Sequence, residues 1–325
     1  MPLIRIEEKE VGETSENSQA FQAFILFDDT AEFPITVSAP FDRAGEAELE
    51  WYFEHFLKFP FTENVRFAQA AQSVIEYGES LFQQVFGNDG IAETYRKYLK
   101  ENPDRWRFEI AGSPEFHSLH WESLKDPNLP RAWALDAPMV RINLKPYHIE
   151  IKAKDSPTVN LLIVTARPRG KNDIAFRTIS KPLVEVFEQT ELPVKIHILR
   201  PGTYQALFQH LEEKKPGHYH VIHFDVHGSL MTYDDLDRGG FLDNSRYGRN
   251  KFTEYEGLRA YLSLETEKES RSDLVEAGEI ADLLTRYQIP VAILNACQSA
   301  KQSGKSDTSL GSRLMSAGVR TVLAM

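Results

Sequence analysis

Short apolar runs alternate with segments of helical pattern from residue 160 to the end, and this alternation limits the fold more than any other feature of the chain. The apolar runs have the length of buried strands, and most of the segments between them carry apolar residues at helical spacing. Predicted strands lie at 160–165, 194–199, 259–264 and 321–325 and within 219–230 and 290–300, and predicted helices at 181–189, 203–214, 279–287 and from about 310. Strands that are joined by helices pair in parallel, so the sequence predicts an α/β fold with a mostly parallel sheet flanked by helices.

The first 150 residues have a different pattern, which is typical of an α+β lobe. Strands are predicted at 3–6, 20–27, 35–37, 106–110 and 139–144, and helices at 46–56, 64–86 and 92–99. The polar run at 149–159, with its Ser156-Pro157 step, is the best candidate for a linker. A chain of 325 residues can form two domains with separate cores. We therefore expect an N-terminal lobe at 1–150, with a packing or regulatory role, and a second domain at 151–325.

Two reactive side chains stand at the ends of predicted strands. His227 ends the run YHVIHFDVH and is followed by Gly228, and Cys297 ends the run PVAILNAC. Because sites in open parallel sheets form at the carboxyl ends of the strands, we expect the imidazole and the thiol at one edge of the sheet. A thiol beside an imidazole is the minimum equipment for acyl transfer by a thiolate.

Cys297 is the only cysteine of the chain, so it cannot form an internal disulfide or a multi-cysteine metal site. A lone cysteine is often a small buried hydrophobic residue. Here the polar run QSAKQSGKSD follows at once, which favours an accessible nucleophile. Gly228 leaves room for a substrate carbonyl and is the candidate for backbone oxyanion binding, although a turn glycine would give the same sequence.

Other chemistries require residues that this region lacks. A cysteine phosphatase has an arginine six positions after the cysteine, whereas residue 303 is serine. The run SAKQSGKS at 299–306 resembles a phosphate-binding loop but begins with serine instead of glycine.

Four histidines crowd the stretch from 218 to 227, which raises the question of a metal site. In a strand, positions 218 and 220 would face away from 223 and 227, and no cluster of carboxylates or thiols completes a ligand set. We therefore expect no metal and no other cofactor. His223 is interpreted as a histidine of the core or of the sheet face.

Charge and hydropathy limit the partners. The net charge of −11 argues against nucleic acid as a direct partner and suits basic peptide substrates. No apolar run approaches the roughly 20 residues that span a bilayer, and the N-terminus has no signal-peptide core. One unpaired cysteine suits a reducing compartment, so we expect a cytoplasmic protein without membrane contact.

Four motifs in this order resemble the CHAT domain family of caspase-like cysteine peptidases related to separase. They are LHWESL at 119–124, HFDVHG at 223–228, LNACQSA at 294–300 and SAGVRTV at 316–322. His120 replaces the proline that is usual in the first motif, and the resemblance runs from about Trp106 to the end. It implies a caspase-like fold in which Cys297 is the nucleophile and His227 is its base.

The resemblance also implies a function. CHAT peptidases cut a specific protein partner when a sensor module triggers them in bacterial defence systems. We expect a cysteine endopeptidase of this kind, and the alternative is a non-catalytic CHAT-fold module for binding or scaffolding. The chain ends on the apolar run VLAM, whereas family members continue, so we expect a fragment of a longer protein that carries a sensor or repeat module.

Substrate choice has the weakest sequence signal. Metacaspase-like relatives have an aspartate two positions before the cysteine, where this chain has Asn295. In caspases, the loop after the first strand lines the pocket for the residue before the scissile bond (P1), and here it contains Asp173. Asp225 lies two positions before His227. We predict that Asp173 and Asp225 contact a basic P1 side chain, and the alternative for each is a solvated charge or a strand-end hydrogen bond.

Overall fold

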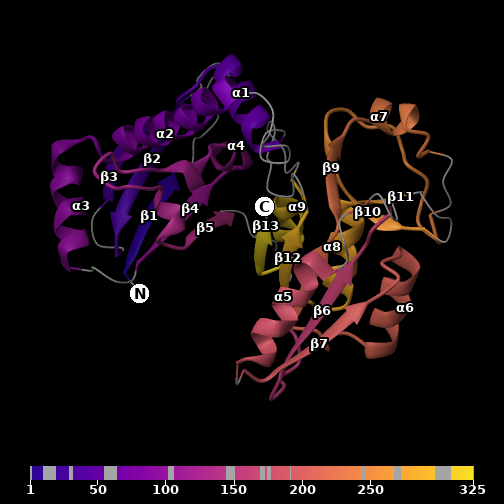
Figure 1. Ribbon diagram of the computed structural model, residues 1–325. Helices are drawn as coiled ribbons and strands as arrows, with labels where there is room; N and C mark the ends of the chain where they lie inside the picture. The colour runs from indigo at the N-terminus through magenta and orange to yellow at the C-terminus, as the bar shows by residue number, and fades with distance from the viewer. Residues whose placement is uncertain are drawn as a thin grey trace. The chain divides into compact units, whose positions relative to one another are not determined.

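The computed structural model describes residues 2–9, 20–28, 32–54, 64–101, 106–143, 151–168, 173, 177–190, 192–242, 246–266, 272–296 and 309–324. The chain divides into two compact units, unit 1 at Met1–Leu144 and unit 2 at Lys145–Met325 (Figure 1). The predicted boundary after residue 150 lies close to this division. The packing or regulatory role of the N-terminal lobe stays a prediction.

Unit 1 is a five-stranded mixed sheet with helices. Its strands, in the spatial order β3-β2-β1-β4-β5, are β3 (Glu32–Ser38), β2 (Ala20–Phe27), β1 (Leu3–Glu8), β4 (Arg107–Gly112) and β5 (Met139–Asn143). β2 pairs antiparallel with both of its neighbours, whereas β4 pairs in parallel with β1 and β5. The helical elements are α1 (Arg43–Glu54), α2 (Asn64–Phe86), α3 (Asp89–Glu101), α4 (Pro114–His117), η2 (Trp121–Ser123) and η3 (Trp133–Leu135).

An aromatic core holds unit 1 together, and Trp121 is its largest fully buried side chain. The indole Nε1 of Trp121 donates a hydrogen bond to the Phe116 carbonyl at 2.8 Å, which satisfies its single polar group. His120, at the unusual position of the first motif, contacts Glu46 through Nε2 at 2.8 Å. Trp121, in the first of the four motifs, is therefore a core residue of unit 1.

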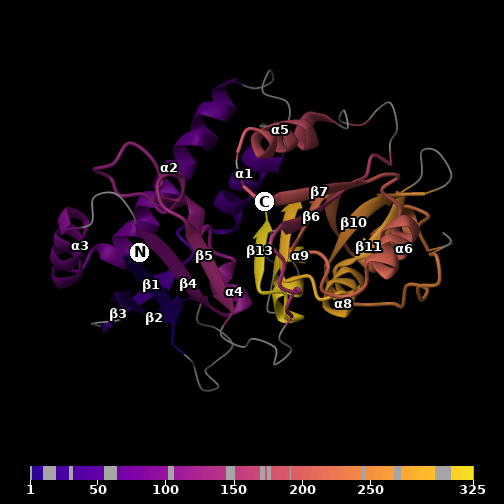
Figure 2. The same ribbon diagram turned by 90° about the horizontal axis from the view of Figure 1, so that it is seen from below.

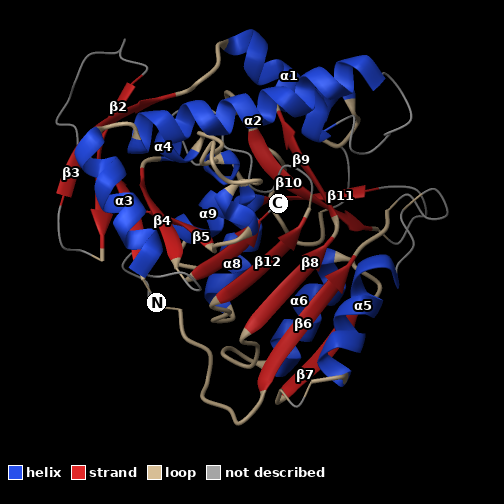
Figure 3. Cartoon of the chain, turned by 60° about the vertical axis from the view of Figure 1, so that its left-hand side comes forward, coloured by secondary structure: helices blue, strands red, loops and turns tan. Residues whose placement is uncertain are grey.

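Unit 2 contains the predicted parallel sheet. Its strands, in the spatial order β13-β12-β8-β6-β7, are β13 (Thr321–Ala324), β12 (Val291–Asn295), β8 (Val221–Asp225), β6 (Val159–Thr165) and β7 (Val194–Leu199). Every neighbouring pair is parallel, and Figure 3 shows β12, β8, β6 and β7 side by side. The helices are α5 (Arg177–Glu188), α6 (Tyr204–Lys214), α8 (Ala277–Arg286) and α9 (Leu310–Ser316). α6 and α8 cover one face of the sheet and α5 lies on the other (Figures 2 and 3).

Alternate strand residues of this sheet enter one core with α6 and α8. Leu162 and Phe224 belong to that core and are fully buried, as are Leu207 of α6 and Ile280 of α8. Ile163, which points to the opposite face, is fully buried too. Burial on both faces explains why the strands read as continuous apolar runs. Among the helices in the described part of the chain, none has both the length and the apolar character to span a bilayer.

A strand lies within 219–230 as predicted, but it ends at Asp225 and not at His227. The chain forms β8 up to Asp225 and then β9 (His227–Met231), which belongs to a separate three-stranded antiparallel sheet of order β11-β10-β9. Val226, between the two strands, is itself buried, so the apolar pattern continues without a break where the chain changes sheets.

The charged segment at 231–271 is an insertion between β9 and β11, and the sequence predicts a single strand in it, at 259–264. It contains that strand, β10 (Arg259–Glu265), and also the short helix α7 (Tyr233–Arg238). β11 (Ser272–Glu276), directly after the insertion, completes the antiparallel sheet and was not predicted. Its apolar run, Leu274–Val275, is only two residues long, and this is too short for a period-2 signal.

Candidate active site

Three neighbouring strands of the parallel sheet end at the same level. Thr165 of β6 pairs with Asp225 of β8, and Asp225 pairs with Asn295 of β12. The backbone amide of Val226 continues this alignment by donating to the Asn295 carbonyl at 3.3 Å. The residues that follow each strand therefore leave one edge of the sheet side by side, because neighbouring strands lie about 5 Å apart.

His227 lies at this edge as the first residue of β9, opposite Ser263 of β10. Its Nε2 is 2.7 Å from Oδ1 of Asp173, whose side chain is only 1% exposed, whereas the imidazole is 28% exposed. A carboxylate accepts hydrogen bonds, so Nε2 carries a proton and donates it toward Asp173. Nδ1 is then the ring nitrogen that remains for proton exchange with a reacting group.

A buried polar network joins the ends of β6, β8 and β12. Arg167, just after β6, donates from Nη2 to Oδ2 of Asp225 and from Nη1 to the Asp225 carbonyl, both at 2.7 Å. The other carboxylate oxygen of Asp225 accepts from Nδ2 of Asn295 at 3.1 Å. Both charged side chains are 4% exposed. Each charge therefore depends on the other, since a buried charge without a partner is strongly destabilising.

Glu265, at the end of β10, connects the antiparallel sheet to the same edge. Its carboxylate accepts the backbone amide of Arg167 at 2.8 Å and that of Gly202, after β7, at 3.0 Å. The Glu265 amide in turn donates to the Gly202 carbonyl at 2.9 Å. The sheet that begins with His227 is thus held to the loops that follow β6 and β7.

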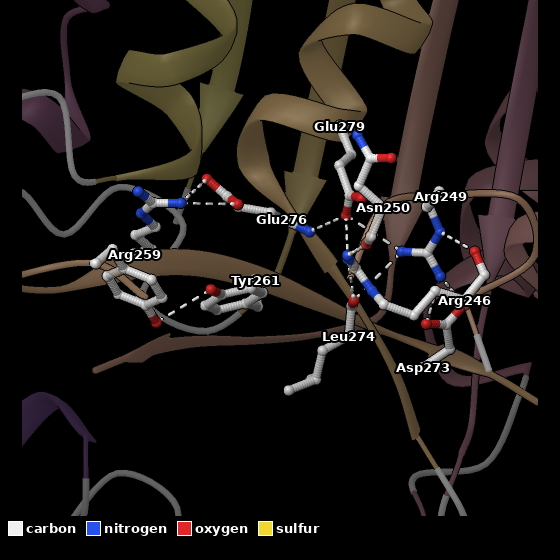
Figure 4. Close-up of polar contacts among 10 residues, drawn as sticks. Arg246, Arg249, Asn250, Arg259, Tyr261, Asp273, Leu274, Glu276 and Glu279 are labelled. Carbon is white, nitrogen blue, oxygen red and sulfur yellow. Dashed lines mark hydrogen bonds and ion pairs between the residues drawn. The ribbon is translucent and has the colours of Figure 1, made fainter. Parts of the chain in front are cut away.

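The insertion is anchored by a second cluster of charges, shown in Figure 4. Arg246 donates to Oε2 of Glu279 at 2.7 Å, and Arg249 reaches the same oxygen at 3.2 Å and also pairs with Asp273. Glu279 additionally accepts the amide of Glu276 at 2.9 Å, which caps the start of α8. Together these contacts hold the insertion against β11 and α8, and so they stabilise the sheet that carries His227.

His223 of β8 is buried and does not join the site. Burial lowers its pKa, and the nearby Asp225 opposes this effect. Its Nδ1 has no hydrogen-bond partner among the described residues. The interpretation of His223 as a residue of the core or sheet face is confirmed. In the described part of the chain, no group of three or more His, Cys, Asp or Glu side chains is arranged to hold a metal ion.

The other predicted site residues have the following positions. Cys297 lies outside the described residues, directly after Ala296, the last of them in this segment. Gly228 lies in β9 opposite Leu262, and its predicted oxyanion role stays a prediction. Asp173 and Asp225, predicted to contact substrate, have His227 and Arg167 as partners, and their substrate contact also stays a prediction.

Three further residues at this edge, Arg167, Asn295 and Glu265, could not be placed there from the sequence. In the sequence, Arg167 is one of several charges in the loop after the first strand, and Asn295 stands where metacaspase-like relatives have aspartate. The contact of both with Asp225 depends on strand register, which a sequence pattern does not specify. Glu265 had no signal at all, because a glutamate at the end of a charged insertion resembles any exposed acidic residue.

Comparison with known proteins gives one result. The sequence model of the CHAT domain matches residues 110–325, about two thirds of the chain. A search of curated proteins found no match. The matched region begins within β4 of unit 1 and includes all of unit 2, so it contains Trp121 as well as the site at the sheet edge. The chain therefore belongs to the CHAT domain family, a caspase-like peptidase family.

Proposed function

We propose that this chain is a cysteine endopeptidase in which Cys297 is the nucleophile and His227 is its general base. The observation that carries the proposal is the shared register of β8 and β12, in which Asp225 pairs with Asn295. His227 and Cys297 each follow a member of this pair by two residues in the sequence. The bound and oriented imidazole of His227 adds a second line of support.

The proposed reaction has two stages. In the first, His227 takes the proton of the Cys297 thiol, the resulting thiolate attacks the scissile carbonyl carbon, and His227 passes the proton to the leaving amide nitrogen as the C–N bond breaks. The product is a thioester and a free amine. In the second, water loses a proton to His227 and attacks the thioester, which releases the carboxylic acid and returns the thiol. Backbone N–H groups near Gly228 are the proposed donors to the oxyanion.

Asp173 is a positioning residue in this proposal. Its buried carboxylate holds Nε2 of His227, so the imidazole presents Nδ1 to the thiol and the imidazolium that forms is stabilised. This differs from the substrate contact expected from the sequence. A basic P1 residue remains the proposed preference because of the net charge of −11, but the contacts of Asp173 and Asp225 do not contribute to the argument for it.

The proposed partner is a specific protein or peptide substrate. As in CHAT peptidases of bacterial defence systems, we propose that a sensor or repeat module, or a partner protein, activates the enzyme in the cytoplasm. The alternative function, a non-catalytic binding module, predicts an ordinary thiol at Cys297. The two functions therefore differ in a property that can be measured without knowing the substrate.

The first test measures the reactivity of the thiol. Cys297 is the only cysteine, so the alkylation rate of the intact protein by iodoacetamide, followed by mass, reports on Cys297 alone. We expect the rate to rise with a midpoint well below the free-thiol pKa of about 8.5, and His227→Ala to return the midpoint toward that value. A wild-type midpoint near 8.5 that His227→Ala does not change would favour the non-catalytic module.

The second test measures acyl transfer. Peptide acyloxymethyl ketones with a scanned P1 residue should label the wild-type protein once and leave Cys297→Ala unlabelled. Faster labelling by probes with a basic P1 residue would support the substrate proposal. Equal or faster labelling by probes with Leu or Met at P1 would contradict it. The positioning role of Asp173 is tested with the variant Asp173→Asn. Its control is Asp237→Asn, at an exposed position of α7, because this change removes the same charge away from the site.

A further inference from the structure

A pocket of about 550 Å³ lies at the amino ends of β6 and β7, at the opposite end of the sheet from His227. Its walls come from the segment before β6, from the first half of β7, and from the end of α6 with the loop that follows. Asn160 lines the pocket, and Thr165 of the same strand marks the active-site edge. Five residues of strand separate them, or about 17 Å, so the pocket is not part of the candidate active site.

Positive charge dominates the lining. Three lysines contribute to it from three different segments, Lys154, Lys195 and Lys214, and all three are exposed. Among the ion pairs of the described residues, none includes these lysines. Among the described residues that line the pocket, Asp155 is the one carboxylate. This concentration of positive charge is notable in a chain with a net charge of −11.

The loop that carries the pocket is held in place by hydrogen bonds to the segment before β6. Lys154 donates its amide to the Gly217 carbonyl at 2.8 Å, and Asn160 donates from Nδ2 to the His218 carbonyl at 2.9 Å. The Asn160 amide donates to Nδ1 of His220 at 3.0 Å, and Nε2 of His220 contacts the Lys154 carbonyl at 3.1 Å. Gly217 has φ +80°, and a Cβ there would approach Lys154 Cγ to 2.9 Å, so the turn requires glycine. The pocket is therefore preformed.

Histidines complete the polar lining. His197 and His218 line the pocket, and His197 stacks on His210 with ring centroids 4.1 Å apart. Nε2 of His210 also contacts the Tyr219 hydroxyl at 2.5 Å. Burial lowers the pKa of His210 to about 4, with further lowering by His197 and Lys214. Burial and Lys214 lower the pKa of His197 and of His218 as well. The positive charges in the pocket thus disfavour protonation of the histidines, and a bound anion would offset this repulsion.

We propose that this pocket binds the polyphosphate chain of a small molecule. Lysine ammonium groups bind phosphate as point charges, and a chain of two or more phosphates carries enough charge to meet three of them at once. The volume is within the range of small-molecule sites. Free polyphosphate and a nucleoside polyphosphate share this chemistry. The site needs neither Cys297 nor peptidase activity, so the inference stands apart from the proposed function.

The test is isothermal titration calorimetry of the whole chain with sodium tripolyphosphate at about 150 mM salt, where only strong charge interactions survive screening. Inorganic phosphate and ATP are the comparison ligands. We expect tripolyphosphate to bind about tenfold or more tightly than inorganic phosphate. ATP binding as tight as that of tripolyphosphate or tighter would indicate a nucleotide, and weaker binding of ATP would indicate free polyphosphate.

Charge-matched variants separate the pocket from general electrostatics. Replacing Lys154, Lys195 and Lys214 by glutamine should weaken tripolyphosphate binding about tenfold or more. The same change at the exposed lysines 97, 100 and 251 removes equal charge outside the pocket and should leave binding within about twofold. Cys297→Ala should bind like the wild type. Equal losses in the two triple variants, or no binding of tripolyphosphate, would overturn the proposal, and so would binding of an RNA oligonucleotide alone.

Proton linkage gives a second readout. A bound anion should raise the pKa values of His197 and His218, which line the pocket, so an imidazole NMR titration should show higher pKa values with tripolyphosphate bound than without it. The carboxylates of Asp155 and Glu213 and the imidazole of His220 are the other titratable groups that lie near these histidines. Histidine pKa values that do not change on addition of tripolyphosphate would contradict the proposed contact with the histidines.

Discussion

The two ends of the parallel sheet in unit 2 use charge in opposite ways. At the carboxyl end, Arg167 and Asp225 are buried and satisfy each other, and the buried carboxylate of Asp173 holds His227. At the amino end, the three lysines of the pocket are exposed and form no ion pairs within the described residues. The same strand, β6, serves both ends, since it starts at the pocket and leads into Arg167.

This difference separates charges that fix geometry from charges that suit a ligand. The two charges of a buried pair stabilise each other. Removing one of them leaves a desolvated charge without a partner, which costs about 3–5 kcal/mol. An exposed lysine without a partner contributes little to stability, within about 0.5 kcal/mol. Substitutions at the carboxyl end should therefore change both activity and stability, whereas substitutions of the lysines at the amino end should leave activity unchanged and alter stability only slightly.

The largest expected effect is on activity at the carboxyl end. Cys297→Ala should abolish peptide cleavage by the activated protein, because a methyl group cannot form the thioester. His227→Ala should reduce the cleavage rate about 10²–10⁴-fold, the usual range for a general base. Lys154→Ala is the control from the amino end and should keep the wild-type rate. Cleavage that persists in Cys297→Ala would refute the catalytic assignment.

The next effect is on stability. Arg167→Met should lower the free energy of unfolding by about 3–5 kcal/mol in a urea titration, because Asp225 would stay buried without its partner. The double variant Arg167→Met, Asp225→Leu should recover part of that loss. Lys195→Met, the matched change at the amino end, should remain within about 0.5 kcal/mol of the wild type. A loss of less than about 1 kcal/mol in Arg167→Met would mean that the pair is not truly desolvated.

Asp173→Asn should have a smaller effect that is confined to catalysis. Asparagine is nearly the same size but cannot stabilise an imidazolium, so we expect kcat to fall about 10–100-fold with little change in KM. The alkylation midpoint of Cys297 should also shift upward, which a loss of substrate binding would not produce. If KM rises and the midpoint stays, Asp173 contacts substrate as the sequence first suggested.

The smallest effect is on the pH dependence of stability at the amino end. The pKa of folded His210 is about 4, below its ordinary value of 6.5, so the unfolded state takes up the proton first as the pH falls. The contribution of the neutral His210 imidazole to the free energy of unfolding is complete above about pH 6.5 and is lost as the pH falls from about 6.5 to 4. Lys214→Ala removes one cause of the lowered pKa and should make this loss shallower. His117, whose pKa burial also lowers to about 4, is unchanged in both proteins and cancels in the comparison.

Imidazole NMR titration gives the same comparison residue by residue. In Lys214→Ala the pKa values of His197, His210 and His218 should rise, and that of His117 should stay. An unchanged His210 would show that burial alone sets its pKa.

Much of the fold could be predicted from the sequence, because buried apolar residues recur with the period of the helix or strand that contains them. α2 has the predicted bounds, and β6, β7 and α6 lie within one residue of theirs. His227 and Cys297 were identifiable for a different reason. A histidine and a single cysteine after apolar runs are conspicuous, and the four ordered motifs indicated the CHAT domain family that the sequence comparison confirmed.

The tertiary structure alone decided which charges meet. Asp173 and His227 are 54 residues apart, and Arg167 and Asp225 are 58 apart, so only the strand register brings them together. The register also ends β8 at Asp225 and places His227 in another sheet, a change that the buried Val226 hides from any hydrophobic pattern. The basic pocket is equally invisible in sequence, since its lysines come from three segments that are individually ordinary. Burial is a property of single residues and leaves a local pattern, whereas pairing depends on two distant residues and is decided only when the chain folds.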